Sequence, residues 1–201
     1  MSMNWSLSEV EPSRGTSNGI QQLRIEEDED ITAFATITAV DPGGSTGICT
    51  IWYWPEGLAA ANLPLQHCLM GWQAECLNGS ENEQTLQVMR WISERSIEES
   101  DVVIEDFILR SAIKGRELLS PVRIGHKIDY QLWRGFKDAT GQRRKIEPSW
   151  QSANDAKNVV NDTRLQSMCM YTPGPDHARD ATRHAILWLR KQRVEILRNS
   201  K

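Results

Sequence analysis

Apolar residues along this chain gather in short runs separated by turn-forming residues, a pattern typical of β-strands. Residues 34–40 and 48–54 are apolar and rich in β-branched or aromatic side chains, and a glycine-rich turn separates them. This arrangement predicts a β-hairpin. Residues 66–72 are expected to add a third strand, and residues 101–107 form a further buried-strand pattern that ends in acids.

Helical spacing separates and follows these strands. In the first helical segment Leu86, Met89 and Ile92 fall on one side, and Val88 and Trp91 widen that apolar face. The alternation of strand, helix and strand predicts an α/β domain. The expected helices are residues 83–96, 121–136 and 176–197.

Shorter elements are expected in the C-terminal half. Residues 108–120 are polar and mixed, which predicts a loop or a frayed helix, and residues 145–150 are expected to form a strand. Asp162 is placed to cap a short helix that starts at the next residue. A Pro-Gly-Pro sequence then forces a turn and leaves Asp176 at the N-cap position of the last helix.

The composition is that of a globular protein with one domain. The 201 residues are 39% hydrophobic and 25% charged, enough for a substantial core. No apolar run approaches the roughly 20 residues of a membrane helix, and the N-terminus lacks a signal-peptide pattern. The cysteines have no paired spacing, which favours free thiols in a reducing compartment. We therefore expect a cytoplasmic protein.

Charge is unevenly distributed, although the net charge is only −4. Residues 1–30 carry seven acids and two bases and end in five consecutive acids, which predicts a disordered acidic tail before a folded domain at 31–201. Residues 106–150 carry ten bases against five acids, and residues 151–201 carry nine against five. This basic half favours binding to a polyanion, although an ordinary solvated helix surface would give the same counts.

Two acids end predicted strands. Asp41 closes the first strand and precedes a turn without bulky side chains, and Glu105 lies at the end of the 101–107 strand. If the two strands are neighbours, these carboxylates converge. Asp106 points to the opposite face because consecutive strand residues alternate. We choose Glu105 because it completes the apolar run, whereas Asp106 begins the exit to the loop.

The start of the last helix offers further metal ligands. His177 and Asp180 are three residues apart, and Asp176 and Asp180 are four apart, so either pair shares one helix face. With the strand acids, such a group can bind two Mg²⁺ or Mn²⁺ ions roughly 4 Å apart. Two ions can divide phosphodiester hydrolysis, one activating water and the other stabilising the leaving oxygen.

The order of these motifs resembles the RuvC-type Holliday-junction resolvases of the ribonuclease H-like superfamily. The resemblance rests on Asp41-Pro42-Gly43 with Thr46-Gly47, on Ile104-Glu105, and on His177-x-x-Asp180-Ala181 before an apolar helix. The stretches Leu119-Ser120-Pro121-Val122-Arg123-Ile124 and His177-Ala178-Arg179-Asp180-Ala181 look like the phage-encoded branch. The resemblance covers residues 33 to about 190.

The resemblance implies a ribonuclease H-like fold with a mixed five-stranded sheet flanked by helices. It implies an Mg²⁺- or Mn²⁺-dependent endonuclease with two ions per site that nicks branched DNA, such as the four-way junction, as a homodimer. Asp41, Glu105 and Asp180 match the family's acids, and His177 falls at its third ligand position. Lys157 is the only lysine between Trp150 and Asp180 and matches a phosphate-binding lysine. A phage-encoded protein would work in the host cytoplasm.

Structural alternatives stay open for several of these residues. Asp41 alone would be explained by an Asx-turn, Asp176 by a helix cap, and Lys157 by a solvated helix face. His184 is expected to be a structural partner of Asp180. The tryptophans Trp52, Trp54, Trp72, Trp91 and Trp188 are expected in the core, whereas Trp133 and Trp150 lie by the basic block, where either is a candidate wedge against a junction.

Three other functions are alternatives to the resolvase hypothesis. The Asp-Pro-Gly turn also resembles the phosphate-binding turn of sugar kinases and actin, but those proteins need two such domains. A nuclease of the same fold that cuts flapped DNA or an RNA–DNA hybrid would share the metal chemistry. A non-catalytic DNA-binding relic of the fold would not need every ligand.

Overall fold

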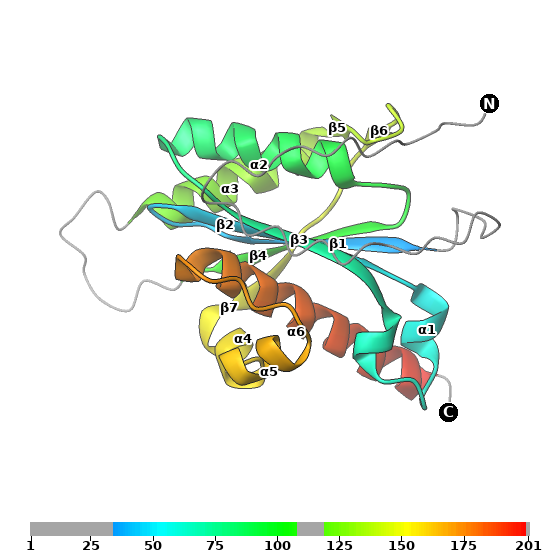
Figure 1. Cartoon of the computed structure of the whole chain (residues 1–201). Helices are drawn as coiled ribbons and strands as arrows, with labels where there is room; N and C mark the ends of the chain where they lie inside the picture. The colour runs from blue at the N-terminus through cyan, green and yellow to red at the C-terminus, as the bar shows by residue number, and fades with distance from the viewer. Residues whose placement is uncertain (1–33, 108–118, 200–201) are drawn as a thin grey trace, which may run out of the picture.

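A computed structural model describes residues 34–107 and 119–199 (Figure 1). The expected acidic tail at 1–30 lies outside these residues, as does nearly all of the 108–120 segment. Within the described part, no helix is both long and apolar enough to cross a lipid bilayer.

The centre of the molecule is a mixed five-stranded sheet, as the sequence predicts. The strand order is β3-β2-β1-β4-β7, in which the first three strands are antiparallel and β4 and β7 run parallel to β1. The 34–40 and 48–54 runs form the expected hairpin. The strands are β1 (Ala35–Asp41), β2 (Thr46–Tyr53), β3 (Leu69–Leu77), β4 (Ser100–Asp106) and β7 (Ser149–Ser152).

Helices cover both faces of the sheet (Figure 1). The helices α2 (Glu81–Arg95) and α3 (Ser120–Arg134) pack on one face, and α6 (Asp176–Asn199) lies along the other with α4 (Ala153–Val159) and α5 (Asp162–Ser167) beside it. The three long helices match the three expected from sequence within two residues at each end. Short elements complete the described chain: α1 (Pro55–Ala59), η2 (Leu65–Cys68), β5 (Phe136–Lys137) and β6 (Arg143–Arg144).

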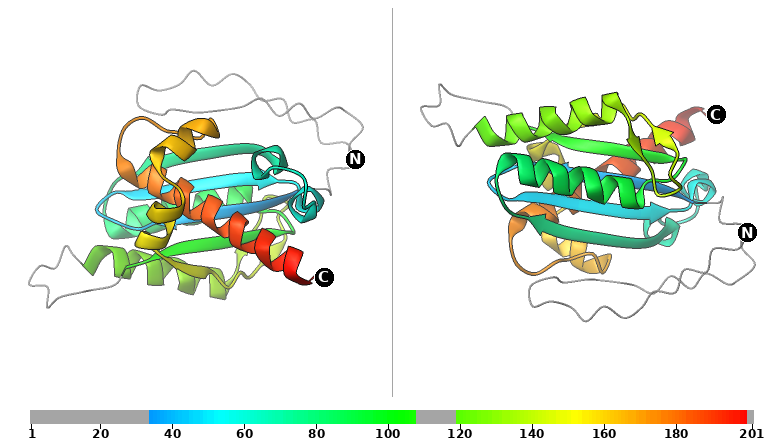
Figure 2. Two further views of the ribbon diagram at one scale, coloured as in Figure 1. Left: turned by 90° about the horizontal axis from the view of Figure 1, so that it is seen from below. Right: turned by 90° about the horizontal axis from the view of Figure 1, so that it is seen from above.

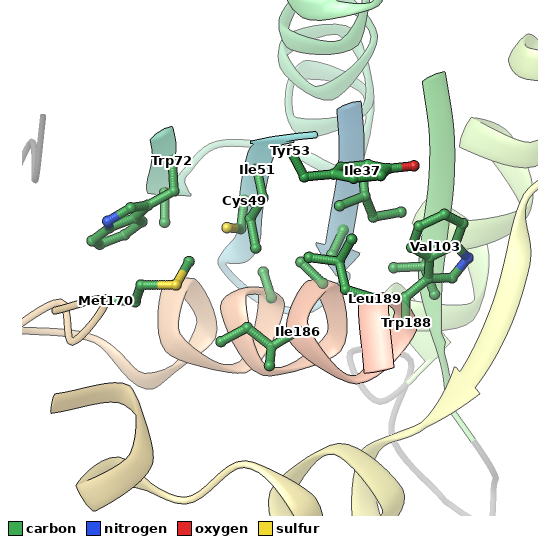
Figure 3. Packing of buried hydrophobic residues seen from close by; sticks show 14 of the residues in the cluster. Ile37, Cys49, Ile51, Tyr53, Trp72, Val103, Met170, Ile186, Trp188 and Leu189 are labelled. Carbon is green, nitrogen blue, oxygen red and sulfur yellow. The ribbon is translucent and has the colours of Figure 1, made fainter. Parts of the chain in front are cut away.

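Side-chain alternation along the strands builds two cores. Ile37 and Ala39 of β1 pack toward α6, whereas Val40 packs toward α2 and α3. Figure 3 shows the first core, in which Ile37, Cys49 and Val103 of the sheet face α6. The same alternation fixes the direction of the acids that end β1 and β4, because each lies two residues beyond a side chain that faces α6.

Two strand predictions need correction at their ends. Residues 65–68 form a 3₁₀ turn after Pro64, so β3 begins at Leu69 and runs on to Leu77. The expected 145–150 strand begins only at Ser149, because Pro148 cannot donate a hydrogen bond to the sheet.

Helix caps also differ from the sequence prediction. Asp162 is the first residue of α5 and not its cap; the side chain of Asn161 accepts the hydrogen bond from the Arg164 amide. Helix α2 starts two residues earlier than expected because Ser80 and Glu83 form a reciprocal capping box.

The buried face of α2 is rotated from the predicted one. Leu86 is 69% exposed, because the face that contacts the sheet is centred on Gln84, Val88 and Ile92. Gln84 is buried because its amide donates to the carbonyls of Gly44 and Gly79. Among the tryptophans expected in the core, Trp72, Trp91 and Trp188 are buried, Trp52 is half-buried, and Trp54 is exposed at the start of α1.

Candidate metal centre

The strand pairing brings Asp41 and Glu105 to one edge of the sheet. Strands β1 and β4 are parallel neighbours with Val40 opposite Ile104, so the two acids that follow lie side by side. Both side chains face α6, by the alternation described above. Asp41 is buried and Glu105 is half-buried, whereas Asp106 is exposed. Glu105, the acid predicted from the sequence, therefore lies next to Asp41.

The first turn of α6 crosses this edge against the backbone of β2. Gly47 is the pairing partner of Asp41 across the hairpin, and a Cβ atom at position 47 would lie 1.9 Å from the carbonyl oxygen of His177. Only a residue without a side chain permits this approach. It places the imidazole Nδ1 of His177 2.8 Å from Oδ2 of Asp41.

Asp180 lies one turn further along α6 and is held by cations. Nζ of Lys157 on α4 lies 2.9 Å from Oδ2 of Asp180, and the guanidinium of Arg183 binds the other carboxylate oxygen. Arg183 also binds Asp162 and donates to the carbonyl of Val160 at 3.0 Å. The bases that surround Asp180 therefore come from α4 and from its own helix.

Glu105 has a different partner, which the sequence did not reveal. Nε2 of His184 lies 2.9 Å from Oε2 of Glu105, and Nδ1 of His184 lies 3.1 Å from Oε1 of Gln151 on β7. His184 is 1% exposed. The expectation that His184 pairs with Asp180 is therefore wrong. The pairing of Asp180 with Arg183 occupies that carboxylate, while β4 and β7 bring Glu105 and Gln151 to His184.

Asp176 does not contact the other acids of the site. It is the first residue of α6, its side chain is 76% exposed, and it forms an ion pair with Arg179. Arg179 in turn donates to the carbonyls of Thr172 and Gly174 in the preceding loop. Of the two alternatives at the helix start, His177 is the one that contacts a strand acid.

The electrostatics confirm that the groups share one environment. Burial raises the pKa of Asp41 from 3.8 to about 6; the charges of Glu105 and Asp180 add to this rise, and the bond with His177 opposes it. The bond to Asp41 raises the pKa of His177, with smaller contributions from Asp180 and Glu105. The charges of Glu105 and Asp180 therefore reach both Asp41 and His177 at one site.

The donor set suits a hard divalent cation. Carboxylate oxygens are the preferred ligands of Mg²⁺ and Mn²⁺, and a buried carboxyl with a raised pKa would be relieved by a cation. In residues 34–107 and 119–199, however, no three acids, histidines or cysteines are close enough to hold one ion as they stand. The carboxylates of Asp41, Glu105 and Asp180 each bind a base instead, so ion binding requires the bonds of Asp41 and Asp180 to exchange.

Known proteins resemble this chain in structure but not in sequence. No protein-family model and no curated protein matches the sequence. The structure of Thermus thermophilus RuvC matches with a TM-score of 0.52 at 12% identity, over 80% of this chain and 97% of that one. T. thermophilus RuvC in complex with a Holliday junction substrate matches with a TM-score of 0.50, also at 12% identity, over 79% and 95%. The chain therefore has the ribonuclease H-like fold of RuvC, as its motifs led us to expect.

Proposed function

We propose that this protein is a divalent-metal-dependent endonuclease that resolves four-way junctions and other branched DNA. The observation that carries the proposal is the meeting of Asp41, Glu105 and Asp180, from β1, β4 and α6, at one edge of the sheet. The fold is shared with RuvC, for which a complex with a Holliday junction substrate is known. The basic C-terminal half suits a polyanionic substrate.

Asp41, Glu105 and Asp180 would hold two Mg²⁺ or Mn²⁺ ions, with His177 as a further ligand. The ions would supply activation of the attacking water and stabilisation of the leaving oxygen. Asp41 is central in this assignment because it is buried, and the charges of both Glu105 and Asp180 add to the rise in its pKa. Asp176 is left to its ion pair with Arg179.

The bases around the acids have separable tasks. Lys157 reaches Asp180 from α4 with a side chain that is 54% exposed, so it is free to turn toward a phosphate once another cation neutralises Asp180. Arg183 is nearly buried and fixed by two acids and a carbonyl, which suits a structural clamp. His184 holds Glu105 in place through the bond between its Nε2 and Oε2 of Glu105.

Homodimerisation belongs to the same proposal. Two symmetric cuts in a four-way junction require two sites, and the described part of the chain contains one group of converging acids. The same metal chemistry would serve a nuclease for flapped DNA or RNA–DNA hybrid, so substrate choice must be measured.

The test is cleavage of a labelled four-way junction, a linear duplex of the same sequence, a flap and an RNA–DNA hybrid, with Mg²⁺, Mn²⁺ or chelator. We expect paired nicks in the junction that disappear with chelator and in Asp41→Asn. Asp106→Asn is the matched control, because it removes the exposed neighbouring acid and should leave cleavage intact. Cutting of the flap or hybrid alone would replace the substrate, and junction binding without any cutting would identify a relic of the fold.

A further inference from the structure

A groove of about 530 Å³ runs between the C-terminal half of α6 and the end of α4. Its apolar floor includes Val159 and Leu187, and its rim carries Arg190, Lys191 and Arg198. Glu195 is the single acid among its lining residues. Figure 2 shows α6 on the outer surface of this side of the molecule, with α4 beside it.

The rim cations are not ion-paired, although Glu195 lies on the same helix. In the described part of the chain none of Arg190, Lys191 and Arg198 forms an ion pair or a side-chain hydrogen bond. Arg193 on the same helix, by contrast, donates to the carbonyls of Ala60 and Leu63. Three cations on one rim without partners are expected to attract an anion.

Arg190 is the most constrained of these cations. It is half-buried, and burial, with a contribution from the charge of Arg164, lowers its pKa below the usual value for an arginine. A guanidinium that is partly removed from water beside a second guanidinium is unfavourable unless a negative group joins them. A phosphate is the natural partner, because guanidinium binds it through two parallel hydrogen bonds.

The groove lies on the same helix as two residues of the candidate metal centre, further toward the C-terminus. Arg183 binds Asp180 on one side and donates to the carbonyl of Val160 on the other, and Val159 already lines the groove. With a rise of about 1.5 Å per residue along α6, Arg190 lies about 15 Å beyond Asp180 and Arg198 about 27 Å beyond it. At about 3.4 Å per base pair, these distances correspond to roughly 4 to 8 base pairs of a duplex.

We propose that this groove binds the phosphate backbone of a DNA arm that leaves the cleavage site, about 4 to 8 base pairs from the scissile phosphate. The inference rests on the proposed function for its ligand. Cations without ion-pair partners that follow one helix away from a phosphodiester-cleaving centre suit a regular polyanion. Contacts of this kind position the substrate and do not read its sequence.

The test uses Lys191→Gln/Arg198→Gln, because both side chains are exposed and their loss should not disturb folding. Binding of a four-way junction is measured against salt concentration and against arm length, with Asp41→Asn in the background to prevent cutting. We expect the slope of log affinity against log salt to fall by about 2, at about 0.9 per lost phosphate contact. Adding Arg190→Gln should lower it further.

Arm length gives a second readout. With the groove intact, the affinity of the protein for the four-way junction should rise as the junction arms are extended from about 4 to about 8 base pairs. The Lys191→Gln/Arg198→Gln variant should lose this rise. The control, Arg90→Gln/Lys137→Gln, removes two exposed cations from the α2 side of the sheet. This control variant should keep the salt slope and the arm-length dependence of the starting protein.

The outcomes separate this inference from the proposed function. An unchanged salt slope and arm-length response in Lys191→Gln/Arg198→Gln would overturn the groove assignment, even if the protein cuts junctions. If the protein never cuts DNA but binds it through the groove, the DNA-binding role of the groove would be supported and the proposed nuclease function would be contradicted. Binding to vesicles of acidic lipid in place of DNA, lost in the same variant, would overturn DNA as the ligand.

Discussion

The backbone of Gly47 lies directly beneath the carbonyl group of His177. A Cβ atom at position 47 would be 1.9 Å from the His177 oxygen and 2.2 Å from its carbonyl carbon. Because Gly47 pairs with Asp41 across the β1–β2 hairpin, this contact sets the height at which α6 crosses the acidic edge of the sheet. The bond between His177 and Asp41 depends on it.

Gly47→Ala should therefore push the first turn of α6 away from the sheet. We expect a loss of about 1–3 kcal/mol in the free energy of unfolding, typical of overpacking. For a domain of this size the melting temperature should fall by about 2–4 °C per kcal/mol. Cleavage should fall more steeply than stability, because His177 and Asp180 move with the helix.

Gly44→Ala is the matched control for that variant. A Cβ atom at position 44 would meet nothing within 4 Å, and Gly44 has no positive φ angle that would strain alanine. Thermal unfolding and junction cleavage of both variants should separate them clearly. Equal effects at the two positions would show that the approach of α6 to β2 does not shape the site.

His184 should act as a positioning residue for Glu105. In His184→Ala the Glu105 carboxylate loses its partner, and the apparent affinity for Mg²⁺ should fall about 10- to 100-fold, as when groups that orient metal ligands are removed. Cleavage at limiting Mg²⁺ should suffer most and should recover in part at high Mg²⁺, while junction binding in chelator stays unchanged. A purely structural role would reduce binding and cleavage together and would not respond to Mg²⁺.

The stability of the metal-free protein should fall as the pH rises. Burial raises the pKa of Asp41 from 3.8 to about 6, so the folded state binds this proton more tightly than the unfolded chain and loses that advantage between about pH 4 and pH 6. The pKa of His177 is also raised above 6.5, so its contribution is lost as the pH rises through its higher folded value. Both groups therefore favour mildly acidic pH when no metal is bound.

Divalent metal should reverse this trend. At pH 7.5, Mg²⁺ at a hundred times its Kd should stabilise the fold by about 2.7 kcal/mol. This gain corresponds to about 5–10 °C in melting temperature for a domain of this size. The increment should shrink at pH 5.5, where protons occupy Asp41 and His177. Thermal melts with and without Mg²⁺ at the two pH values check this, and a metal-induced shift of the same size at both would argue against Asp41 as a ligand.

The two candidate wedge tryptophans should behave differently. Trp133 is 64% exposed, stacks on Tyr130 with ring centroids 5.9 Å apart, and has Nζ of Lys145 5.5 Å from its ring centroid; its exposed area is available to an unpaired base. Trp133→Ala should weaken junction binding by about 1–3 kcal/mol, the range for base stacking on an aromatic ring, with a smaller effect on duplex binding. Equal affinity of Trp133→Ala and the starting protein for the junction would remove this residue as a wedge.

Trp150 should instead contribute to folding. Its ring lies against Gly125 of α3, where an added Cβ would be 3.2 Å from Cη2, and its centroid lies 5.5 Å from that of His126. Trp150→Ala should lower the free energy of unfolding by on the order of 2 kcal/mol, because part of a packed aromatic is lost. Denaturant unfolding checks this, and normal stability with weak junction binding would restore the wedge interpretation.

The sequence predicted the strands and the helix that carry the site residues, because local patterns determine these elements. The apolar run that ends at Asp41 and the run that ends at Glu105 each predicted a strand, and period-two alternation separated Glu105 from Asp106. Helical spacing placed His177 and Asp180 on one face of the last helix. Each of these inferences needs only neighbours along the chain and the assumption that two strands are adjacent.

The partners of the acids could not be predicted in the same way. His184 is four residues from Asp180 in sequence but bonds to Glu105, 79 residues away, because α6 lies across β4. Leu86 looked like a core residue until the contacts of Gln84 fixed the rotation of α2. The groove beside Arg190 likewise exists only once α4 and α6 have packed together. Such features depend on tertiary contacts that no local pattern encodes.

Mn²⁺ binding at the centre tests the account most directly. Crystals grown with Mn²⁺ should show anomalous scattering peaks in contact with Asp41, Glu105 and Asp180, with the bond between His177 and Asp41 exchanged for metal contacts. The same crystals of Asp41→Asn should lose at least one peak. The central claim would be contradicted if the acids kept their present partners, His177, His184 and Lys157, and held no ion at Mn²⁺ concentrations that support cleavage.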